Sequence, residues 1–265
     1  MKELPCDLPE VSALPRRRRL RRTVFILPSL FTVGNIFCGY FAIVSSTMRG
    51  NYDDAAQAIG IAIFLDMLDG RIARLTNSAT DFGLQLDSLA DVISFGIAPS
   101  LLAFVWGLST LNHGLGWTAA FTFTICGAMR LARFNIGARD LKHFVGLPIP
   151  AGGGMIVAIV HFFVQPVATQ IGATFLVIAV FLLAFLMVST IRYPSLKSLT
   201  LGRKSHIAIL FIALLVALIY NYSRWTLLIV AMTYASSGVI ARVYSFARHR
   251  KSGEEIPLAD PIEHH

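Results

Sequence analysis

Four aspartates in the stretch FLDMLDGRIARLTNSATDFGLQLDSLAD, residues 64–91, form a pattern that could carry chemistry. Asp66 precedes Asp69 by three residues, and Asp87 precedes Asp91 by four. Residues three or four apart share one face of an α-helix. The segment between the two pairs is short and polar, which makes their helices antiparallel neighbours. We therefore predict that the four carboxylates converge at one end of two adjacent helices.

Metal ions are the chemistry that such a cluster indicates. Carboxylates held close together favour protonation of one another unless cations lie between them. Ligand sets made only of oxygen atoms favour Mg, Mn or Ca over Zn or Cu. The predicted metal ligands are Asp66, Asp69, Asp87 and Asp91.

Small residues and one arginine accompany the acids. Gly70 and Ala73 lie on the stripe of the first pair, and Gly83 lies on the stripe of the second. Side chains this small let a bulky group approach the backbone. Arg74, one turn beyond Gly70, is suited to bidentate contact with a phosphate. Metal, space and an arginine together predict a phosphorylated ligand.

The spacing of these residues distinguishes a functional motif from ordinary packing residues. A single aspartate near a helix end is usually solvated, and a glycine or alanine in an apolar helix is usually a packing residue. The full order is Asp, two residues, Asp-Gly, two residues, Ala-Arg, eight residues, Gly, three residues, Asp, three residues, Asp. Such a fixed order indicates a functional motif.

The elements that position this motif are transmembrane helices. Of the 265 residues, 55% are hydrophobic and only 14% are charged, with a mean hydropathy of +0.65, which excludes an ordinary soluble domain. An ionised carboxylate inside such a helix costs about 2.5–3.5 kcal/mol, so the acids need a reason to be there. The predicted fold is an all-α, polytopic membrane helical bundle with about eight transmembrane helices, because eight apolar runs approach the roughly 20 residues that cross a bilayer. These runs are 25–48, 55–73, 88–111, 115–137, 149–168, 171–191, 206–222 and 225–244.

Basic residues predict the orientation. The segment PRRRRLRR precedes the first run, and cytoplasmic segments collect Lys and Arg. Eight spans from a cytoplasmic amino terminus leave only Arg49 and Arg224 on the far side. We therefore divide the chain into a basic cytoplasmic arm, 1–24, a transmembrane domain, 25–246, and a cytoplasmic tail, 247–265. The net charge of +8 then reflects orientation and attraction to anionic lipids, and nucleic-acid binding is not expected because no soluble domain presents a basic face.

The motif from Asp66 to Asp91 resembles in full the signature of the CDP-alcohol phosphotransferases. These are membrane enzymes that move a substituted phosphate from a CDP-linked donor to an alcohol. The resemblance implies that Asp66, Asp69 and Asp87 bind a pair of divalent ions, Mg²⁺ or Mn²⁺, and that Ca²⁺ occupies the site without supporting turnover. It also implies that Asp91 contributes to the metal site and is the catalytic base.

Segments that overlap or lie beyond the motif are similar to the branch of this family that uses L-serine as the acceptor. They are LFTVGNIFCGYFAI, DSLADVISFGIAPSLL, RLARFN, GLPIPAGGG and MVSTIRYPSLK, within residues 25–200. The branch implies transfer of phosphatidyl from CDP-diacylglycerol to serine, which gives phosphatidylserine and CMP. It further implies a homodimer in the cytoplasmic membrane of a prokaryote, with the active site and both termini facing the cytoplasm. Beyond residue 205 the similarity is one of hydropathy only.

Two alternatives remain. A sister transferase that uses glycerol 3-phosphate, inositol or choline would share every residue of the motif. A transporter would be expected to hold its acids near the bilayer midplane, whereas these acids cluster at one end beside a basic loop.

Further residues are expected at the substrates, in two groups. Helix packing or helix–helix hydrogen bonding is the alternative for Thr32 and Asn35. Snorkelling is the alternative for Arg130, Arg133 and Asn135. Residues expected at the nucleotide or CDP-lipid are Gly70, Ala73, Arg74, Gly83, Thr32, Asn35 and Ser78. Residues expected at the acceptor or a phosphate are Arg130, Arg133, Asn135, Arg192, Tyr193 and Lys197. Toward the opposite membrane face, His161, Gln165 and His113 are interpreted as structural.

Overall fold

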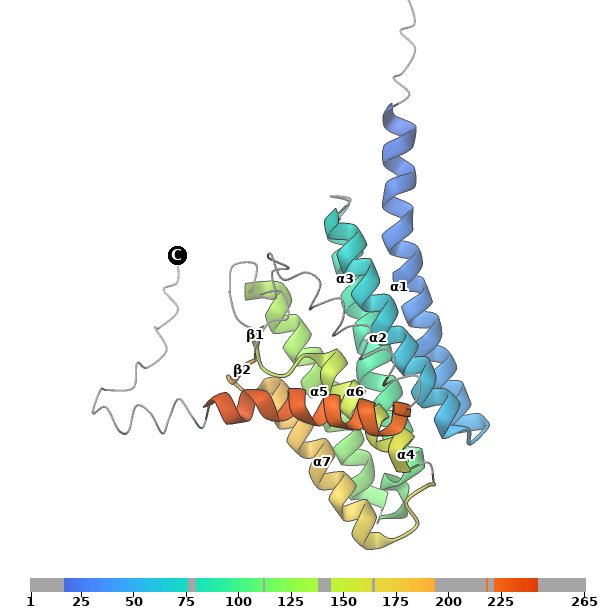
Figure 1. Cartoon of the computed structure of the whole chain (residues 1–265), viewed down its shortest axis with the longest axis vertical. Helices are drawn as coiled ribbons and strands as arrows, with labels where there is room; N and C mark the ends of the chain where they lie inside the picture. The colour runs from blue at the N-terminus through green and yellow to red at the C-terminus, as the bar shows by residue number, and fades with distance from the viewer. Residues whose placement is uncertain are drawn as a thin grey trace, which may run out of the picture.

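The computed structural model describes residues 17–75, 80–111, 113–137, 144–163, 165–193, 218 and 222–242. Across these residues the chain forms a helical bundle, and the all-α prediction is confirmed (Figure 1). The long helices are α1 (Arg17–Met48), α2 (Tyr52–Leu75), α3 (Asp81–Asp91), α4 (Ala98–Trp106), α5 (His113–Gly137), α6 (Ile149–Phe163), α7 (Gln170–Val188) and a last helix, Tyr222–Arg242. The π-helix η1 (Val92–Ile97) joins α3 to α4, and η2 (Leu108–Thr110) is a short 3-10 helix.

Helices α1 and α2 pack against each other as an antiparallel hairpin. Gly50 has a φ of 62°, the left-handed conformation that commonly follows a helix end. The backbone N–H of Asn51 then donates to the carbonyl of Ser45 at 3.0 Å. Buried alanines such as Ala42 and Ala55 let the two backbones approach closely. This hairpin holds the first acid pair, on α2, beside α1.

The second acid pair lies in one continuous helical segment, Asp81–Trp106, made of α3, η1 and α4. Thr80 caps its start, because its hydroxyl oxygen accepts from the Gly83 N–H at 3.0 Å. The helical segment therefore begins and ends before the bounds predicted for the span 88–111, at Asp81 and Trp106. The π-helical turn starts directly after Asp91, and π turns inside α-helices are frequent at functional sites.

Glycine packing brings α6 against this segment. A Cβ atom on Gly153 would lie 2.8 Å from the carbonyl oxygen of Phe95 and 3.2 Å from the Cγ of Pro99. Only a glycine permits that approach of α6 to η1 and α4. The motif GLPIPAGGG thus contributes to packing behind the acid-bearing helix.

Among the described residues, an antiparallel pair of two-residue strands, β1 (Phe144–Val145) and β2 (Arg192–Tyr193), accompanies the helices. Gly146 follows β1 with a φ of 81°, and its N–H donates to the carbonyl of Ile191 at 2.9 Å. The pair fixes the start of α6 next to the end of α7.

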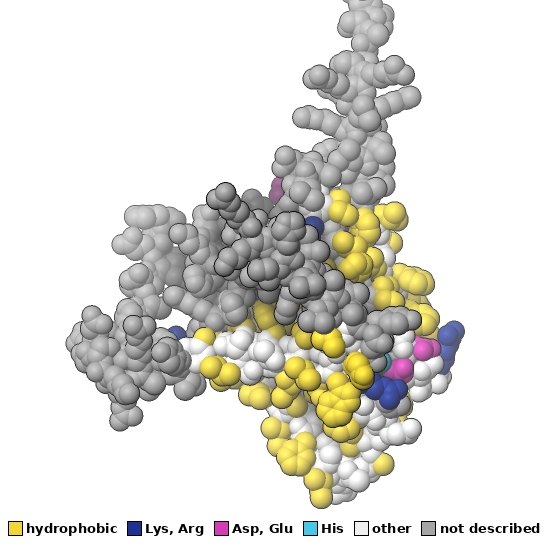
Figure 2. All heavy atoms as spheres, viewed as in Figure 1, with side chains coloured by type: hydrophobic (Ala, Val, Ile, Leu, Met, Phe, Trp, Pro, Cys, Tyr) yellow, Lys and Arg dark blue, Asp and Glu magenta, His cyan; other side chains and the backbone are white. Residues whose placement is uncertain are grey.

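Four described helices are long and apolar enough to cross a membrane: Ser29–Met48, Asp81–Trp106, Gln170–Val188 and Tyr222–Arg242. Large hydrophobic side chains on them are exposed, including Phe37 and Phe185, and Figure 2 shows such side chains over much of the coloured surface. These features indicate an integral membrane protein. The count of eight spans stays a prediction, because α2 and α5 carry charges, α6 is shorter, and run 206–222 lies outside the described residues except for Leu218 and Tyr222.

Candidate metal and nucleotide site

Three carboxylates meet between α2 and α3. One oxygen each from Asp66, Asp69 and Asp87 can be chosen so that all three atoms lie within 4.8 Å of one another. The carboxyl group of Asp91 lies within electrostatic reach of Asp66, Asp87 and Asp69. The predicted convergence of the four acids is therefore what the two helices produce.

Burial distinguishes the acids. Asp69 is 3% exposed and Asp91 is 9% exposed, while Asp66 and Asp87 are half-buried. One oxygen each of Asp87 and Asp91 is buried without a hydrogen-bond partner among the described residues. A buried anionic oxygen without a partner is costly, so these atoms are suited to a cation.

The donor set fits a hard divalent ion. Such ions hold their oxygen ligands at about 2.0–2.6 Å, so oxygens that share one ion lie within about 5 Å of each other. The three clustered carboxylates meet this condition, and every donor is an oxygen. The cluster could therefore hold a metal ion, and its chemistry favours Mg, Mn or Ca.

Helix α1 forms the wall behind the first acid pair. The Thr32 hydroxyl donates to an Asp69 carboxylate oxygen at 3.3 Å. One turn later Asn35 is fully buried, and neither polar atom of its side chain has a partner in the described part of the chain. Its backbone carbonyl accepts from the Ser94 hydroxyl at 2.9 Å, which joins α1 to η1. Thr32 therefore contacts the acid cluster directly. Asn35, one turn along α1, has a buried side-chain amide without a hydrogen-bond partner among the described residues.

The small residues of the motif have more than one role. A Cβ atom on Gly83 would lie 3.1 Å from the Thr80 hydroxyl, so Gly83 also allows a tight helix start. Gly70 is half-buried beside Asp69. Ala73 and Arg74 continue α2, but their side chains lie outside the described structure, as does Ser78.

The predicted acceptor residues divide by position. Arg130 on α5 is partly buried, lies within electrostatic reach of Asp91, and has a buried Nε without a partner in the described chain. Arg133 is exposed and donates to the carbonyl of Val188 at 3.3 Å, at the end of α7. The Asn135 amide donates to the hydroxyl of Ser88 at 3.0 Å, which joins α5 to the helix of the second acid pair.

The remaining acceptor candidates lie on or after β2. Tyr193 is fully buried, and its hydroxyl donates to the carbonyl of Ala235 at 3.2 Å, so it faces the last helix. The side chain of Arg192 and all of Lys197 are outside the described residues. Among the described acceptor candidates, Arg130 is thus within electrostatic reach of Asp91, and Asn135 contacts the residue that follows Asp87.

Sequence reasoning missed two side chains around the site. Ser94 bonds to α1 behind the acids, and its signal was its place in DSLADVISFGIAPSLL, three residues after Asp91. Tyr234 on the last helix lies within electrostatic reach of Arg130. Nothing in the sequence pointed to Tyr234, because beyond residue 205 the chain resembles the family in hydropathy only.

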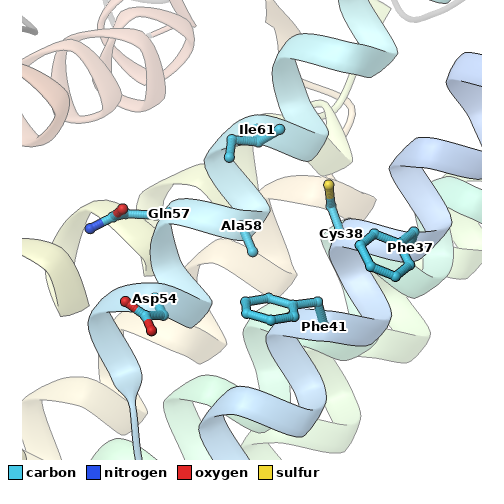
Figure 3. Close-up of a pocket in the computed structure, with 7 residues that line it drawn as sticks. All are labelled: Phe37, Cys38, Phe41, Asp54, Gln57, Ala58 and Ile61. Carbon is cyan, nitrogen blue, oxygen red and sulfur yellow. The ribbon is translucent and has the colours of Figure 1, made fainter.

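A hollow lies toward the other end of α2. It has a volume of about 300 Å³ and runs between α1 and α2 (Figure 3). Its lining is mostly apolar and comprises Phe37, Cys38, Phe41, Asp54, Gln57, Ala58 and Ile61. None of the four clustered aspartates lines it, so it is separate from the candidate metal site.

Comparison with known proteins places this site in a family. The family model described as CDP-alcohol phosphatidyltransferase matches residues 25–237, which include all four aspartates. The chain belongs to the CDP-alcohol phosphatidyltransferase family. The family predicted from the motif is thereby confirmed.

Curated members of this family resemble the chain over most of their length. A CDP-diacylglycerol–serine O-phosphatidyltransferase of Helicobacter pylori is 36% identical over 233 residues, 80% of this chain and 95% of the relative. One of Bacillus subtilis with the same name is 40% identical over 171 residues, 64% of this chain and 91% of the relative. An archaetidylserine synthase of Methanothermobacter thermautotrophicus is 36% identical over 175 residues, 65% of this chain and 71% of the relative.

Proposed function

We propose that this chain transfers the phosphatidyl group of CDP-diacylglycerol to L-serine and releases phosphatidylserine and CMP. The observation that carries the proposal is the convergence of Asp66, Asp69, Asp87 and Asp91 between α2 and α3. Relatives named for transfer to serine, from bacteria and archaea, support serine as the acceptor.

Asp66, Asp69 and Asp87 would hold the metal, which we propose to be a pair of Mg²⁺ or Mn²⁺ ions, with Ca²⁺ binding but not supporting turnover. When bound, such ions neutralise the charge of a pyrophosphate and of the departing CMP. Thr32 supports this arrangement, because its hydroxyl donates to Asp69 and fixes the orientation of that carboxylate.

Asp91 would act as the general base. Its carboxyl is buried at the end of α3, and one oxygen lacks a partner among the residues the structure describes. That oxygen would take the proton of the serine hydroxyl as the serine oxygen forms a bond to the phosphorus that bears diacylglycerol. The bond from that phosphorus to the CMP oxygen breaks, and the electron pair leaves with CMP.

The other predicted residues would hold the two substrates. Gly70, Ala73, Arg74 and Gly83 of the motif would hold the nucleotide and pyrophosphate, together with Thr32, Asn35 and Ser78. The acceptor side would include Arg130, with Arg133, Asn135, Arg192, Tyr193 and Lys197 as further candidates. Arg130 is favoured because its guanidinium lies within electrostatic reach of Asp91.

We also propose the setting predicted from the sequence. The enzyme would be a homodimer in the cytoplasmic membrane of a prokaryote, with both termini and the site facing the cytoplasm. The arginines of the segment PRRRRLRR, most of which lie in the first turns of α1, support this orientation.

Release of CMP by the purified protein tests the function. With CDP-diacylglycerol and Mg²⁺ or Mn²⁺, L-serine should support CMP release, whereas ethanolamine, choline, inositol and glycerol 3-phosphate should not. Ethanolamine lacks the carboxylate, and a buried cation left without its partner disfavours binding. Equal turnover with glycerol 3-phosphate or inositol would assign the chain to a sister branch, and no CMP release with any acceptor would contradict the transferase itself.

A further inference from the structure

One short stretch of α1, residues 32–35, contacts both helical segments that carry the acids. The Thr32 hydroxyl donates to an Asp69 carboxylate oxygen on α2 at 3.3 Å. Three residues later, the backbone carbonyl of Asn35 accepts from the Ser94 hydroxyl at 2.9 Å, and Ser94 belongs to the segment of the second acid pair. Both bonds are buried. Helix α1 therefore connects the acids of α2 to those of α3.

The bond from Ser94 depends on a close approach of η1 to α1. A Cβ atom on Gly39 would lie 2.9 Å from the Cα and 3.1 Å from the Cβ of Ser94, so a glycine is required at this position of α1. Ser94 is fully buried, so water does not compete for its hydroxyl. A hydrogen bond shielded from water in this way is stronger than one at the surface. It holds η1 firmly against α1.

The π-helical turn that contains Ser94 sets the rotation of α3. The N–H of Ala98 donates to the carbonyl of Ile93, which is the five-residue spacing of a π-helix. Such a turn takes up one residue more than an α-helical turn, which rotates the helix before it relative to the helix after it by about 100°. Asp87 and Asp91 lie just before the turn. The direction in which their carboxyl groups point therefore depends on it.

Ser100 is a matched hydroxyl in the same helical segment, beyond the π-helical turn. Its side chain is also buried, at 4% exposure. Its hydroxyl donates to the carbonyl of Ile97 at 2.9 Å and accepts from the hydroxyl of Thr124 on α5 at 2.9 Å. These bonds lie within the segment and toward α5, whereas the bond of Ser94 reaches α1. The pair therefore separates an effect of the α1 contact from that of losing any buried hydroxyl.

We propose that Ser94 is a positioning residue that holds the acids of α3, Asp87 and Asp91, toward the acids of α2. This inference rests on the proposed metal site. Ser94 acts through the turn that it fixes and not by touching an acid. With the turn bonded to α1, the oxygens that α2 and α3 offer to a divalent ion keep a fixed separation. Loss of that bond lets α3 rotate and weakens the shared site.

The first test is titration calorimetry of the purified full-length protein with Mn²⁺, which needs neither substrate. Ser94→Ala should raise the Mn²⁺ Kd about tenfold, the lower end of the loss that follows removal of a group supporting metal ligands. Ser100→Ala should stay within twofold of the parent, and thermal unfolding checks that both variants are folded. A Kd for Ser94→Ala within twofold of the parent, or an equal rise in both variants, would overturn the inference.

Gly39→Ala disturbs the same contact from the side of α1. Its methyl group would meet the backbone of Ser94 and push η1 away, so the Mn²⁺ Kd should rise at least as much as in Ser94→Ala. Gly60→Ala is the control, because a Cβ atom there meets nothing within 4 Å. An unchanged Kd in Gly39→Ala would show that the acids do not depend on this contact.

Kinetics at saturating Mn²⁺ give a second readout. Ser94→Ala should lower kcat about tenfold, because a misplaced reacting group slows the chemical step, and should leave the serine KM within twofold. A raised serine KM with an unchanged kcat would contradict the positioning role. A parent protein that does not bind Mn²⁺ would overturn the metal site and this inference together. A parent that binds Mn²⁺ but shows no serine-dependent CMP release would contradict the transferase proposal alone.

Discussion

Asp91 is the residue whose position decides the chemistry. It is the last residue of α3, and the π-helical turn begins directly after it. Its carboxyl lies within electrostatic reach of Asp66 across the helix pair, which places a candidate base near the candidate metal ligands. The proposed cation site and the proposed proton acceptor therefore lie in one group of side chains.

Asp91→Asn tests the base. An amide keeps the shape of the side chain but cannot take up the serine proton, so turnover should fall by about 10²–10⁴-fold. The variant should still insert into the membrane and bind CDP-diacylglycerol, which a lipid-binding assay on the purified protein measures. If the variant keeps more than about a tenth of the parent turnover, Asp91 is not the general base.

The metal ligands are tested by Asp66→Ala, Asp69→Ala and Asp87→Ala. Each removes a carboxylate from the cluster, and turnover should fall by roughly 100-fold or more, as when a charge-stabilising group is removed from an active site. EDTA should silence the parent enzyme until Mg²⁺ or Mn²⁺ is returned. Asp54→Ala is the matched control, because this aspartate is exposed at the other end of α2. Full activity in excess EDTA would contradict the metal site.

At the scale of elements, close contact between helices places the acids. Helix α6 reaches η1 and α4 through Gly153, and α1 reaches η1 through Gly39, where a Cβ atom would lie 2.9 Å from the Cα of Ser94. Both contacts surround the turn that follows Asp91. Any displacement of these helices would therefore move the carboxyl of Asp91 relative to Asp66.

Gly153→Ala tests this packing. The new methyl group would meet the backbone of Phe95, so we expect a destabilisation of about 1–3 kcal/mol and a parallel loss of transfer activity. Gly60→Ala on α2 is the control, because a Cβ atom there meets nothing within 4 Å and alanine favours a helix. Thermal unfolding in detergent and CMP release measure the two effects. Equal stability of the two variants would show that α6 can move without cost.

At the scale of the whole molecule, the question is which membrane face holds the site. The Arg49 and Arg224 positions should be accessible from outside the cell, and the loop at Ser78 should be accessible from the cytoplasm. Single cysteines introduced beside these residues, in a protein whose Cys6, Cys38 and Cys126 are replaced, can be labelled with an impermeant reagent. Labelling only at Ser78 in intact cells would reverse the orientation and the placement of the site.

The sequence by itself determined the helical class, the family and the four aspartates, because the helix period and the spacing of a motif are local properties. Residues three or four apart share a face whatever surrounds them, so the stripe of Asp66 and Asp69 could be read directly. Hydropathy located most of the helices in the same way, since α1, α2, α5, α6 and α7 overlap the predicted apolar runs.

Tertiary structure decided what no local pattern could show. Thr32 bonds to Asp69 across 37 residues, and Ser94 bonds to Asn35 across 59, so these contacts depend on which helices become neighbours. Packing separated Arg130, near Asp91, from Arg133, which turns to the end of α7. The last helix contacts the bundle through bonds from Tyr193 to Ala235 and between His161 and Ser223, which lie 42 and 62 residues apart in the chain. Such placements follow from the sum of many distant contacts, which hydropathy and spacing along the chain do not encode.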